Sequence, residues 1–580
     1  MSELVAVRSK AFPHVYIIVA GAAVLLGMLG ASLPFSKFIL IIAGAIVAAF
    51  ALANTTFAIV LLVTAVPLVG FGVNLGPVPI DAVTICTALV IISYAIHNLG
   101  TGDKRPSVPY AWAFLAFLVF GAVSAVVAPS TVESAAVIIR FIGYFALVYA
   151  VGYSVRSREA LTWILILMIV AGAITGLYGI YQYTYAPQTA KIGLYDLSDE
   201  VAARVGSTFE NPNFYAEYLV LMVPLGLALV LGSRGLFRRF AMGGATLLLF
   251  AALILTYTRG SWMATGIGVI LMSLLTNAWL VWVWIALFAV AFAAAPGVAS
   301  RLASITNITG GTAGFRMKLW RIAAGIIREH PLIGVGIGNY YDVFTEYIFR
   351  HPELSVGWVI YGAHNSYLTF WAETGIFGIL SFVAIILISI KYGLYLSRAK
   401  AKDRYLSWIN SAIVAGVIGF AINSLTSNSF HHPQPAVFFW LLLGLQVAID
   451  GLGPEPAHHE VSPYAEGSSI LRNLNRAKAT LSAAYQAHAI NRIILFSGGI
   501  WRKSGLMVWL FKKPATPSLA VGSTFYAPVK RTARAFRGWG EATLMAKFAA
   551  EVAERPFVAS LLFAGIALAV WALSVPAVGR

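Results

Sequence analysis

Apolar runs of about 20 residues, separated by short polar segments, recur along most of the chain. Each run is long enough to cross a hydrocarbon core of about 30 Å as a helix. They predict an all-α polytopic membrane protein with about 14 transmembrane helices, followed by one C-terminal span. The runs lie at 15–33, 38–53, 56–76, 80–97, 110–128, 134–154, 160–183, 215–232, 241–258, 261–276, 278–296, 366–391, 406–425, 436–450 and 558–577.

The positions of the basic residues predict the orientation of these spans. Alternating from a cytoplasmic N-terminus places the short basic loops on one side, as lysine and arginine enrichment of cytoplasmic loops requires. These loops contain Lys104 and Arg105, Arg156 and Arg158, Arg234 to Arg239, and Lys391 to Arg404. Arg8 and Lys10 precede the first apolar run as in a signal peptide, but the many later spans favour an uncleaved helix.

Within the predicted membrane-embedded core, residues 1–450, the segment 297–365 falls on the outer side. Its residues 314–330 predict a helix, because Phe315, Leu319 and Ile322 recur at helical spacing. Pro331 and the glycine-rich run 334–338 then end that helix. We therefore expect a large, partly helical periplasmic loop. The glycine run follows a helix instead of a strand, so it does not predict a nucleotide site.

Composition narrows the class of protein. The chain has 580 residues, of which 59% are hydrophobic and 11% charged, whereas soluble domains carry about 25% charged residues. The formal charge of +17 would suit nucleic-acid binding, but basic cytoplasmic loops explain it, and we expect no nucleic-acid partner. The single cysteine, Cys86, excludes an intrachain disulfide and a cysteine-based zinc site.

The segment 451–557 falls on the cytoplasmic side and carries 14 Lys and Arg against 6 Asp and Glu. Its stretch Ile470–Ile490 has an apolar face and basic residues elsewhere, which is typical of a helix lying on anionic lipid. A cytoplasmic protein partner fits the same pattern. Residues 558–580 then predict a final transmembrane helix.

Four polar groups gather on the predicted outer side, and each has a structural explanation beside a functional one. Asn211-Pro212-Asn213, after Arg204, is turn chemistry that could also present amides to a ligand. Arg259 lies in a tight turn between two spans, where an arginine either reaches lipid headgroups or faces a phosphate.

The third group contains Arg316, Lys318, Arg321 and Arg328 on the predicted outer helix. Arg316 and Lys318 do not share a helical face, whereas Arg321 and Arg328 are seven residues apart and could do so. At most part of this set can therefore reach one ligand.

The fourth group, His364-Asn365 and then Glu373, enters a span. A histidine at this position is either structural or catalytic. A carboxylate within a membrane requires a partner, and Arg140 is the candidate for Glu373.

The order and spacing of these groups resemble the O-antigen ligase and polysaccharide polymerase family. The similar motifs are Gly206-Ser-Thr-Phe-Glu-Asn211-Pro212-Asn213, Thr258-Arg259-Gly260-Ser261-Trp262, Arg316-x-x-x-Trp320, His330-Pro331-Leu-Ile-Gly334-Val-Gly336 and His364-Asn365-Ser-Tyr-Leu368. The resemblance covers about residues 200–390. Residues 451–580 extend beyond the usual family core.

The resemblance implies a glycosyltransferase of the bacterial inner membrane that moves glycans from undecaprenyl diphosphate at the periplasmic face. It implies Arg204 and Arg316 as diphosphate ligands and His364 as the base that takes the acceptor proton. Arg259 is a further candidate ligand, and Glu373 resembles a supporting feature of the family. The remaining candidate substrate-binding residues are Arg140, Arg321, Asn211, Asn213 and Asn365.

The residue types agree with that chemistry. Guanidinium groups can hold a diphosphate leaving group by paired hydrogen bonds, and a histidine can accept a hydroxyl proton near neutral pH. No outer carboxylate cluster suits a divalent metal, so we expect no metal and no cofactor, and a single displacement would invert the anomeric carbon. A flippase or other secondary transporter, and a scaffold that recruits partners through its basic tail, are the alternatives. The sequence does not identify the acceptor, which is a glycan or a lipid-linked molecule, so it does not distinguish a ligase from a polymerase.

Overall fold

The computed structural model describes residues 35–68, 72–75, 78–98, 107–186, 204–209, 211–233, 235–277, 280–294, 311–355, 362–453 and Lys512. These residues form fifteen α-helices, three 3₁₀ turns and one short hairpin. The predicted spans 15–33 and 558–577 lie outside the described residues. So does the predicted amphipathic stretch Ile470–Ile490.

Every predicted span between residues 38 and 450 has a helix at its place in the described chain. The helices are α3 (Phe35–Ala53), α4 (Thr55–Leu68), α5 (Ala82–Asn98), α6 (Ala111–Ala125), α7 (Thr131–Ser154), α8 (Arg158–Tyr185), α9 (Pro212–Gly232), α10 (Leu236–Leu255), α11 (Arg259–Thr276), α12 (Leu280–Ala294), α16 (Ser366–Ala399), α17 (Arg404–Asn423) and α18 (Pro433–Gly451).

The described chain is all-α as predicted, apart from one short hairpin, and one predicted span needs correction. The span expected at 56–76 ends at Leu68, next to Pro67, whose ring cannot continue a helix. Strands β1 (Gly72–Leu75) and β2 (Val78–Asp81) follow and pair antiparallel, with Gly72 opposite Asp81. The prediction followed hydropathy and gave no weight to Gly72, Asn74 and Gly76-Pro77, which are turn signals.

Seven helices of the described chain are long and apolar enough to cross a membrane by length and composition, namely α7, α8, α9, α10, α16, α17 and α18. Five shorter apolar helical segments accompany them, in α3, α4, α5, α6 and α12. The chain is therefore a multi-pass helical membrane protein, while the count of about 14 spans plus one stays a prediction.

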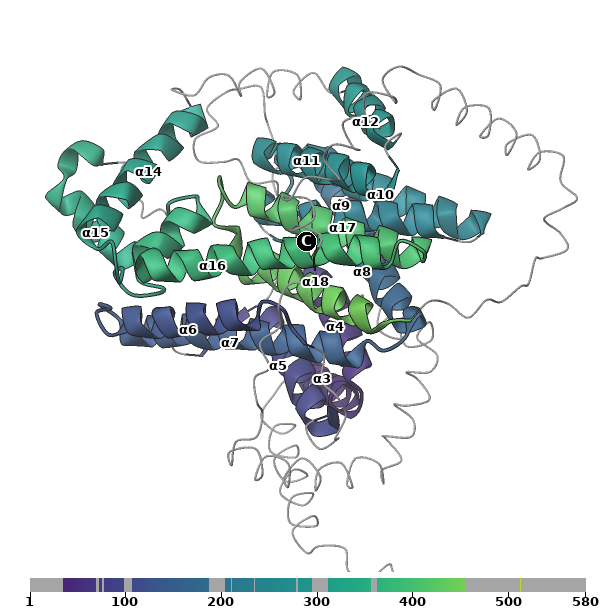
Figure 1. The fold of residues 1–580 in the computed structure, drawn as a ribbon, viewed down its shortest axis with the longest axis horizontal. Coiled ribbons are helices and arrows are strands. Elements are labelled where there is room, and N and C mark those ends of the chain that lie inside the picture. The colour runs from purple at the N-terminus through teal and green to yellow at the C-terminus, as the bar shows by residue number, and fades with distance from the viewer. Residues whose placement is uncertain are drawn as a thin grey trace, which may run out of the picture.

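The helices form a bundle in which α6, α7, α10, α11, α16 and α17 run roughly along the long direction, whereas α3 and α12 are inclined to it (Figure 1). Helices α9 and α18 lie in its interior, where Tyr218, Phe438 and Trp440 are fully buried. The outward faces of other helices carry exposed apolar side chains, such as Ile139 and Leu387. Apolar side chains facing outward are what a lipid environment favours.

Two further helices, α14 (Gly311–Glu329) and α15 (Tyr340–Arg350), project from one end of the bundle (Figure 1). They have a core of their own, in which Leu319 and Ile322 of α14 are buried with Phe344 of α15. Arg350 closes this unit by donating two hydrogen bonds to Glu329, of 3.1 and 2.7 Å. The structure thus confirms the helix predicted at 314–330.

The glycine-rich run after α14 attaches the unit formed by α14 and α15 to a break in α16. Gly375 has a φ of +66° there, and a break frees carbonyl groups that a continuous helix would use. The amides of Val335 and Gly336 donate to the carbonyls of Ala372 and Glu373, at 2.9 and 3.0 Å. The run is therefore a wedge between α14 and the break in α16, and its hydrogen bonds fix the α14–α15 unit on α16.

At the opposite end of the bundle, polar contacts join the start of α8 to the start of α17. Arg158 pairs with Asp403, and the hydroxyls of Thr162 and Tyr405 lie 2.6 Å apart. The ring of Tyr405 also packs against Gly232 at the end of α9. The described parts of three basic loops therefore lie together, away from α14 and α15.

Candidate functional site

His364 adopts a left-handed backbone conformation, with a φ of +47°. Among the described residues, only Ser207, Tyr257 and His364 do so without being glycine. Ser207 and His364 belong to motifs recognised in the sequence, and Tyr257 directly precedes the Thr258-Arg259 motif. Such a conformation costs about 1–3 kcal/mol and persists only where surrounding contacts impose it, often at functional sites.

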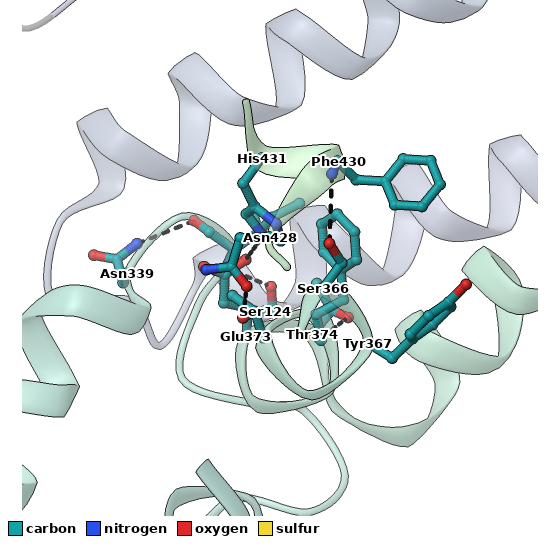
Figure 2. A network of polar contacts seen from close by, with 12 residues as sticks. Ser124, Asn339, Ser366, Tyr367, Glu373, Thr374, Asn428, Phe430 and His431 are labelled. Carbon is teal, nitrogen blue, oxygen red and sulfur yellow. Dashed lines mark hydrogen bonds and ion pairs between the residues drawn. The ribbon is translucent and has the colours of Figure 1, made fainter. Parts of the chain in front are cut away.

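The contacts that impose it come from the turn between α17 and α18, residues 424–432, here called the α17–α18 turn. The amide of Asn365 donates to Asn428 Oδ1 at 2.9 Å. The amide of Ser366 donates to the carbonyls of Ser424 and Ser427, at 2.9 and 3.1 Å. Figure 2 shows Asn428 and Ser366 within this network. The turn therefore clamps the residues that directly follow His364.

Asn365 caps α16, as its position before a span suggests. Its side-chain oxygen accepts hydrogen bonds from the amides of Tyr367 and Leu368, at 3.0 and 3.1 Å. These amides would otherwise lack partners at the start of a helix. Asn365 is therefore part of the support of His364, and its capping role explains its residue type.

The guanidinium group of Arg316 lies close enough to His364 to act on its charge. Burial lowers the pKa of the His364 imidazole to about 4, and the positive charge of Arg316 contributes to that shift. Arg316 lies on α14 and is half-buried, and His364 is also half-buried. The charge of Arg316 therefore acts on the His364 imidazole, from a helix that packs on α16.

Two further histidines of the α17–α18 turn belong to the same electrostatic environment. Burial lowers the pKa of His432 well below its usual value, and the charges of His431, His364 and Arg140 lower it further. The ring of His432 lies 3.6 Å, centre to centre, from that of Phe214 in the first turn of α9. His432 therefore connects the surroundings of His364 with the start of α9.

Glu373 is buried at the break of α16, where its carboxylate lies 3.6 Å from Nε2 of His431. The expected pairing with Arg140 is not found among the ion pairs of the described chain, since His431 occupies that place. His431 is fixed by stacking on Phe370, with ring centres 4.3 Å apart. Glu373 Oε2 and both ring nitrogens of His431 are buried without a hydrogen-bond partner among the described residues. Figure 2 shows Glu373 and His431 facing this network.

Arg204 lies in a separate but adjoining network. Its guanidinium donates to the Thr256 carbonyl at 3.0 Å, to Asn213 Oδ1 at 2.9 Å and to Thr258 Oγ1 at 3.0 Å. Asn211 caps α9 and accepts from the Asn213 amide at 2.8 Å, so the predicted turn chemistry is confirmed. Arg204 thereby joins the start of α9 to the turn between α10 and α11.

The turn between α10 and α11 also contacts the end of α17. Ser261 donates to Asn423 Oδ1 at 2.9 Å, and Gly260 lies against Thr426, where a Cβ would approach the hydroxyl to 2.7 Å. Arg259 is the first residue of α11 and is half-buried beside these contacts. The Arg259 segment is therefore packed onto the α17–α18 turn.

The other basic residues of α14 point elsewhere. Lys318, Arg321 and Arg328 are exposed, whereas Arg316 is half-buried. The sequence predicted that only part of this group could reach one ligand. Arg316 is the half-buried member of this group, and Arg321 lies on the exposed surface of α14.

Sequence reasoning missed the polar residues that organise this end of the bundle. Asn428, His431 and His432 belong to a run of polar side chains between two apolar spans, which was the available signal. Glu217 was a second signal, since it is a lone carboxylate within the predicted span 215–232. A charge in such a position marks a functional or structural polar contact.

The fold and the site define a multi-pass helical membrane protein with a site of arginines and histidines at one end of its bundle. Residues 244–383 match the model of a family described as O-antigen ligase. This match confirms the resemblance predicted from the motifs. It includes Arg259, Arg316 and His364, and the Arg204 motif lies before it. No curated protein matches the chain at a significant level.

Proposed function

We propose that this protein transfers a glycan from undecaprenyl diphosphate to an acceptor hydroxyl at the periplasmic face of a bacterial inner membrane. The observation that carries the proposal is the electrostatic effect of Arg316 on His364, whose neighbour Ser366 is bound by the α17–α18 turn. The Arg259 motif contacts the end of α17 next to that turn, and the Arg204 network contacts the Arg259 motif through Thr258. The family match over residues 244–383 supports a glycosyltransferase of the O-antigen ligase or polymerase type.

In this proposal, arginines stabilise the negative charge that develops on the leaving diphosphate. Arg316 binds it next to His364, and Arg204 and Arg259 bind or support it at the start of α9 and α11. Helices α9, α11, α16 and α18 all begin at this end of the bundle. Helix N-termini carry partial positive charge that favours anions. Donors aimed at developing charge contribute a few kcal/mol each.

His364 takes the proton from the acceptor hydroxyl as that oxygen attacks the anomeric carbon. A pKa of about 4 keeps its imidazole neutral, and therefore able to accept a proton, throughout the physiological range. The C–O bond to the diphosphate breaks as the new glycosidic bond forms, which inverts the anomeric configuration. General-base assistance of this kind contributes about 10²–10⁴ in rate.

The positive charge of the arginines fills the role that a divalent metal has in other diphosphate-dependent transferases, so the proposed reaction needs no metal. Among the residues that the structure describes, no three His, Cys, Asp or Glu side chains gather into a metal site.

The test is transfer by the purified protein in detergent, with a synthetic polyprenyl-diphosphate-linked glycan as donor. Arg316→Ala and His364→Ala should each abolish transfer while the protein still folds and elutes as the parent does. Arg328→Ala and His330→Ala are the matched controls, since both side chains are exposed on the same α14–α15 unit, and both should retain activity.

Detergent also separates an enzyme from the transporter alternative, because transport requires two compartments and transfer requires one. Full activity of the Arg316 and His364 variants would refute the proposed mechanism. Absence of transfer, together with donor translocation in sealed vesicles, would favour a flippase.

A further inference from the structure

Glu217 is the one carboxylate within α9, and its side chain is fully buried in the bundle. It lies four residues, about one helical turn, after Asn213, which binds Arg204. A buried carboxylate inside a membrane protein is costly unless its oxygens are satisfied, and it therefore marks a functional position. The proposed chemistry does not use Glu217 directly.

The partner of Glu217 lies on the α17–α18 turn. Ser427 donates its hydroxyl hydrogen bond to Glu217 Oε1, while Oε2 has no hydrogen-bond partner among the described residues. The carbonyl of Ser427 in turn accepts from both the amide and the hydroxyl of Ser366, each at 3.1 Å. A continuous chain of hydrogen bonds thus leads from Glu217 through Ser427 to Ser366, two residues after His364.

We propose that Glu217 is a positioning residue for the His364 base, acting through Ser427 and the α17–α18 turn. The proposal rests on the proposed function and deepens it. Because His364 has a strained backbone, it keeps its position only while the turn holds Asn365 and Ser366. Glu217 fixes that turn to α9, the helix that also begins with the Arg204 network. It thereby fixes the position of His364 relative to Arg204, which is expected to hold the donor.

The first variant is Glu217→Ala, which removes the acceptor of the Ser427 hydroxyl. A displacement of a reacting group by about 1 Å can cost about 10² in rate, so kcat should fall by about that factor while KM for the donor stays unchanged. Ser427→Ala removes the same hydrogen bond from the other side and should have a similar effect. The double variant should lose no more than Glu217→Ala alone, because that variant already removes the interaction with Ser427 along with the one with Ser429.

Glu217→Gln is the conservative variant. Its amide oxygen can still accept the Ser427 hydrogen bond, so it should restore most of the kcat that Glu217→Ala loses. Gln446→Leu is the matched control, because Gln446 is also buried, lies on α18 and has side-chain atoms without partners in the described chain. It lies beside Gly393 of α16, away from the turn, and should leave kcat unchanged.

A second readout follows His364 itself and needs no turnover. Diethyl pyrocarbonate modifies neutral imidazole, and mass spectrometry can measure its rate at His364 as a function of pH. If the turn moves and His364 becomes more exposed, the midpoint of this profile should rise from the parent value towards 6.5 in Glu217→Ala, and return in Glu217→Gln.

An unchanged His364 profile and unchanged kcat in both Glu217→Ala and Ser427→Ala would overturn the proposal. It would also fail if Glu217→Gln were as impaired as Glu217→Ala, because charge would then matter in place of the hydrogen bond. Should Glu217→Ala not fold, Ser427→Ala decides the question. A parent protein without transferase activity would refute the proposed function, and the modification profile would still test the link from Glu217 to His364.

Discussion

The pKa of His364 leads to the sharpest prediction about the proposed base. A free histidine side chain has a pKa of about 6.5, and burial together with Arg316 lowers that of His364 to about 4. The difference corresponds to about 3 kcal/mol that disfavours the protonated form. The neutral form accepts a proton, so the base should be active down to pH values well below those typical of histidine. At pH 7 only about one His364 side chain in a thousand would be protonated.

The measurement is the rate of diethyl pyrocarbonate modification at His364 between pH 3.5 and 8, with the exposed His330 as internal reference. We expect the His364 rate to fall only as the pH approaches 4. In Arg316→Gln the midpoint should move upwards, because a positive neighbour that opposes protonation has been removed. It should stay below 6.5, because burial is the larger cause of the shift. A parent midpoint at 6.5, or no upward movement in Arg316→Gln, would refute this account of the site.

Donor binding should reverse part of this shift. A diphosphate bound to Arg316 would add negative charge beside His364 and raise the pKa of its imidazole, making it a stronger base when it is needed. In pH–rate profiles, kcat/KM reports groups of the free enzyme and kcat reports those of the bound complex. The acidic limb of kcat should therefore lie at higher pH than that of kcat/KM. Coincident limbs would mean that Arg316 and the diphosphate do not act on the base together.

Two further predictions concern the support of the site and its chemistry. Gly375→Ala should lower the unfolding temperature in detergent, because its φ is +66° and a Cβ would lie 2.0 Å from the Leu332 carbonyl oxygen. Gly44→Ala is the control, because Gly44 has a helical position with open space around it. Equal unfolding temperatures of the two variants would contradict the role of the glycine-rich run as a wedge. EDTA should leave transfer unchanged, because guanidinium groups supply the charge on the diphosphate, and a loss restored by Mg²⁺ would contradict metal independence.

The periodic signals of the sequence predicted the helices well, because lipid leaves few alternatives to a helix for an apolar run. The helix at 314–330 was predicted from the spacing of Phe315, Leu319 and Ile322, whose apolar face packs against α15 and α16. The hairpin at 72–81 was not predicted, because the span was assigned from hydropathy, although Gly72, Asn74 and the Gly76-Pro77 dipeptide are turn signals. Local turn preferences decide the structure here, and hydropathy does not report them.

The candidate site was predicted only in part, because its arrangement depends on tertiary packing. Arg316 and His364 are 48 residues apart in the sequence and were associated through family motifs, whereas their proximity depends on how α14 is seated on α16. The partner of Glu373 was expected to be Arg140, because both lie in the outer part of their spans. Two residues at the same depth in a membrane need not lie on helix surfaces that meet. Here His431 of the α17–α18 turn, and not Arg140, lies next to Glu373.

The α17–α18 turn links residues of motifs that are distant in the sequence. It contacts His364-Asn365 through Asn428, reaches α9 through Ser427, and adjoins Asn423, which accepts from Ser261 of the Arg259 motif. A reaction between two large substrates requires the base and the diphosphate ligands to keep one geometry while both substrates enter and leave. Three helices that meet at one hydrogen-bonded turn provide that rigidity without using the reacting groups themselves. Substitutions in the turn should therefore reduce kcat through the position of His364, even though none of its side chains is required to touch the glycan.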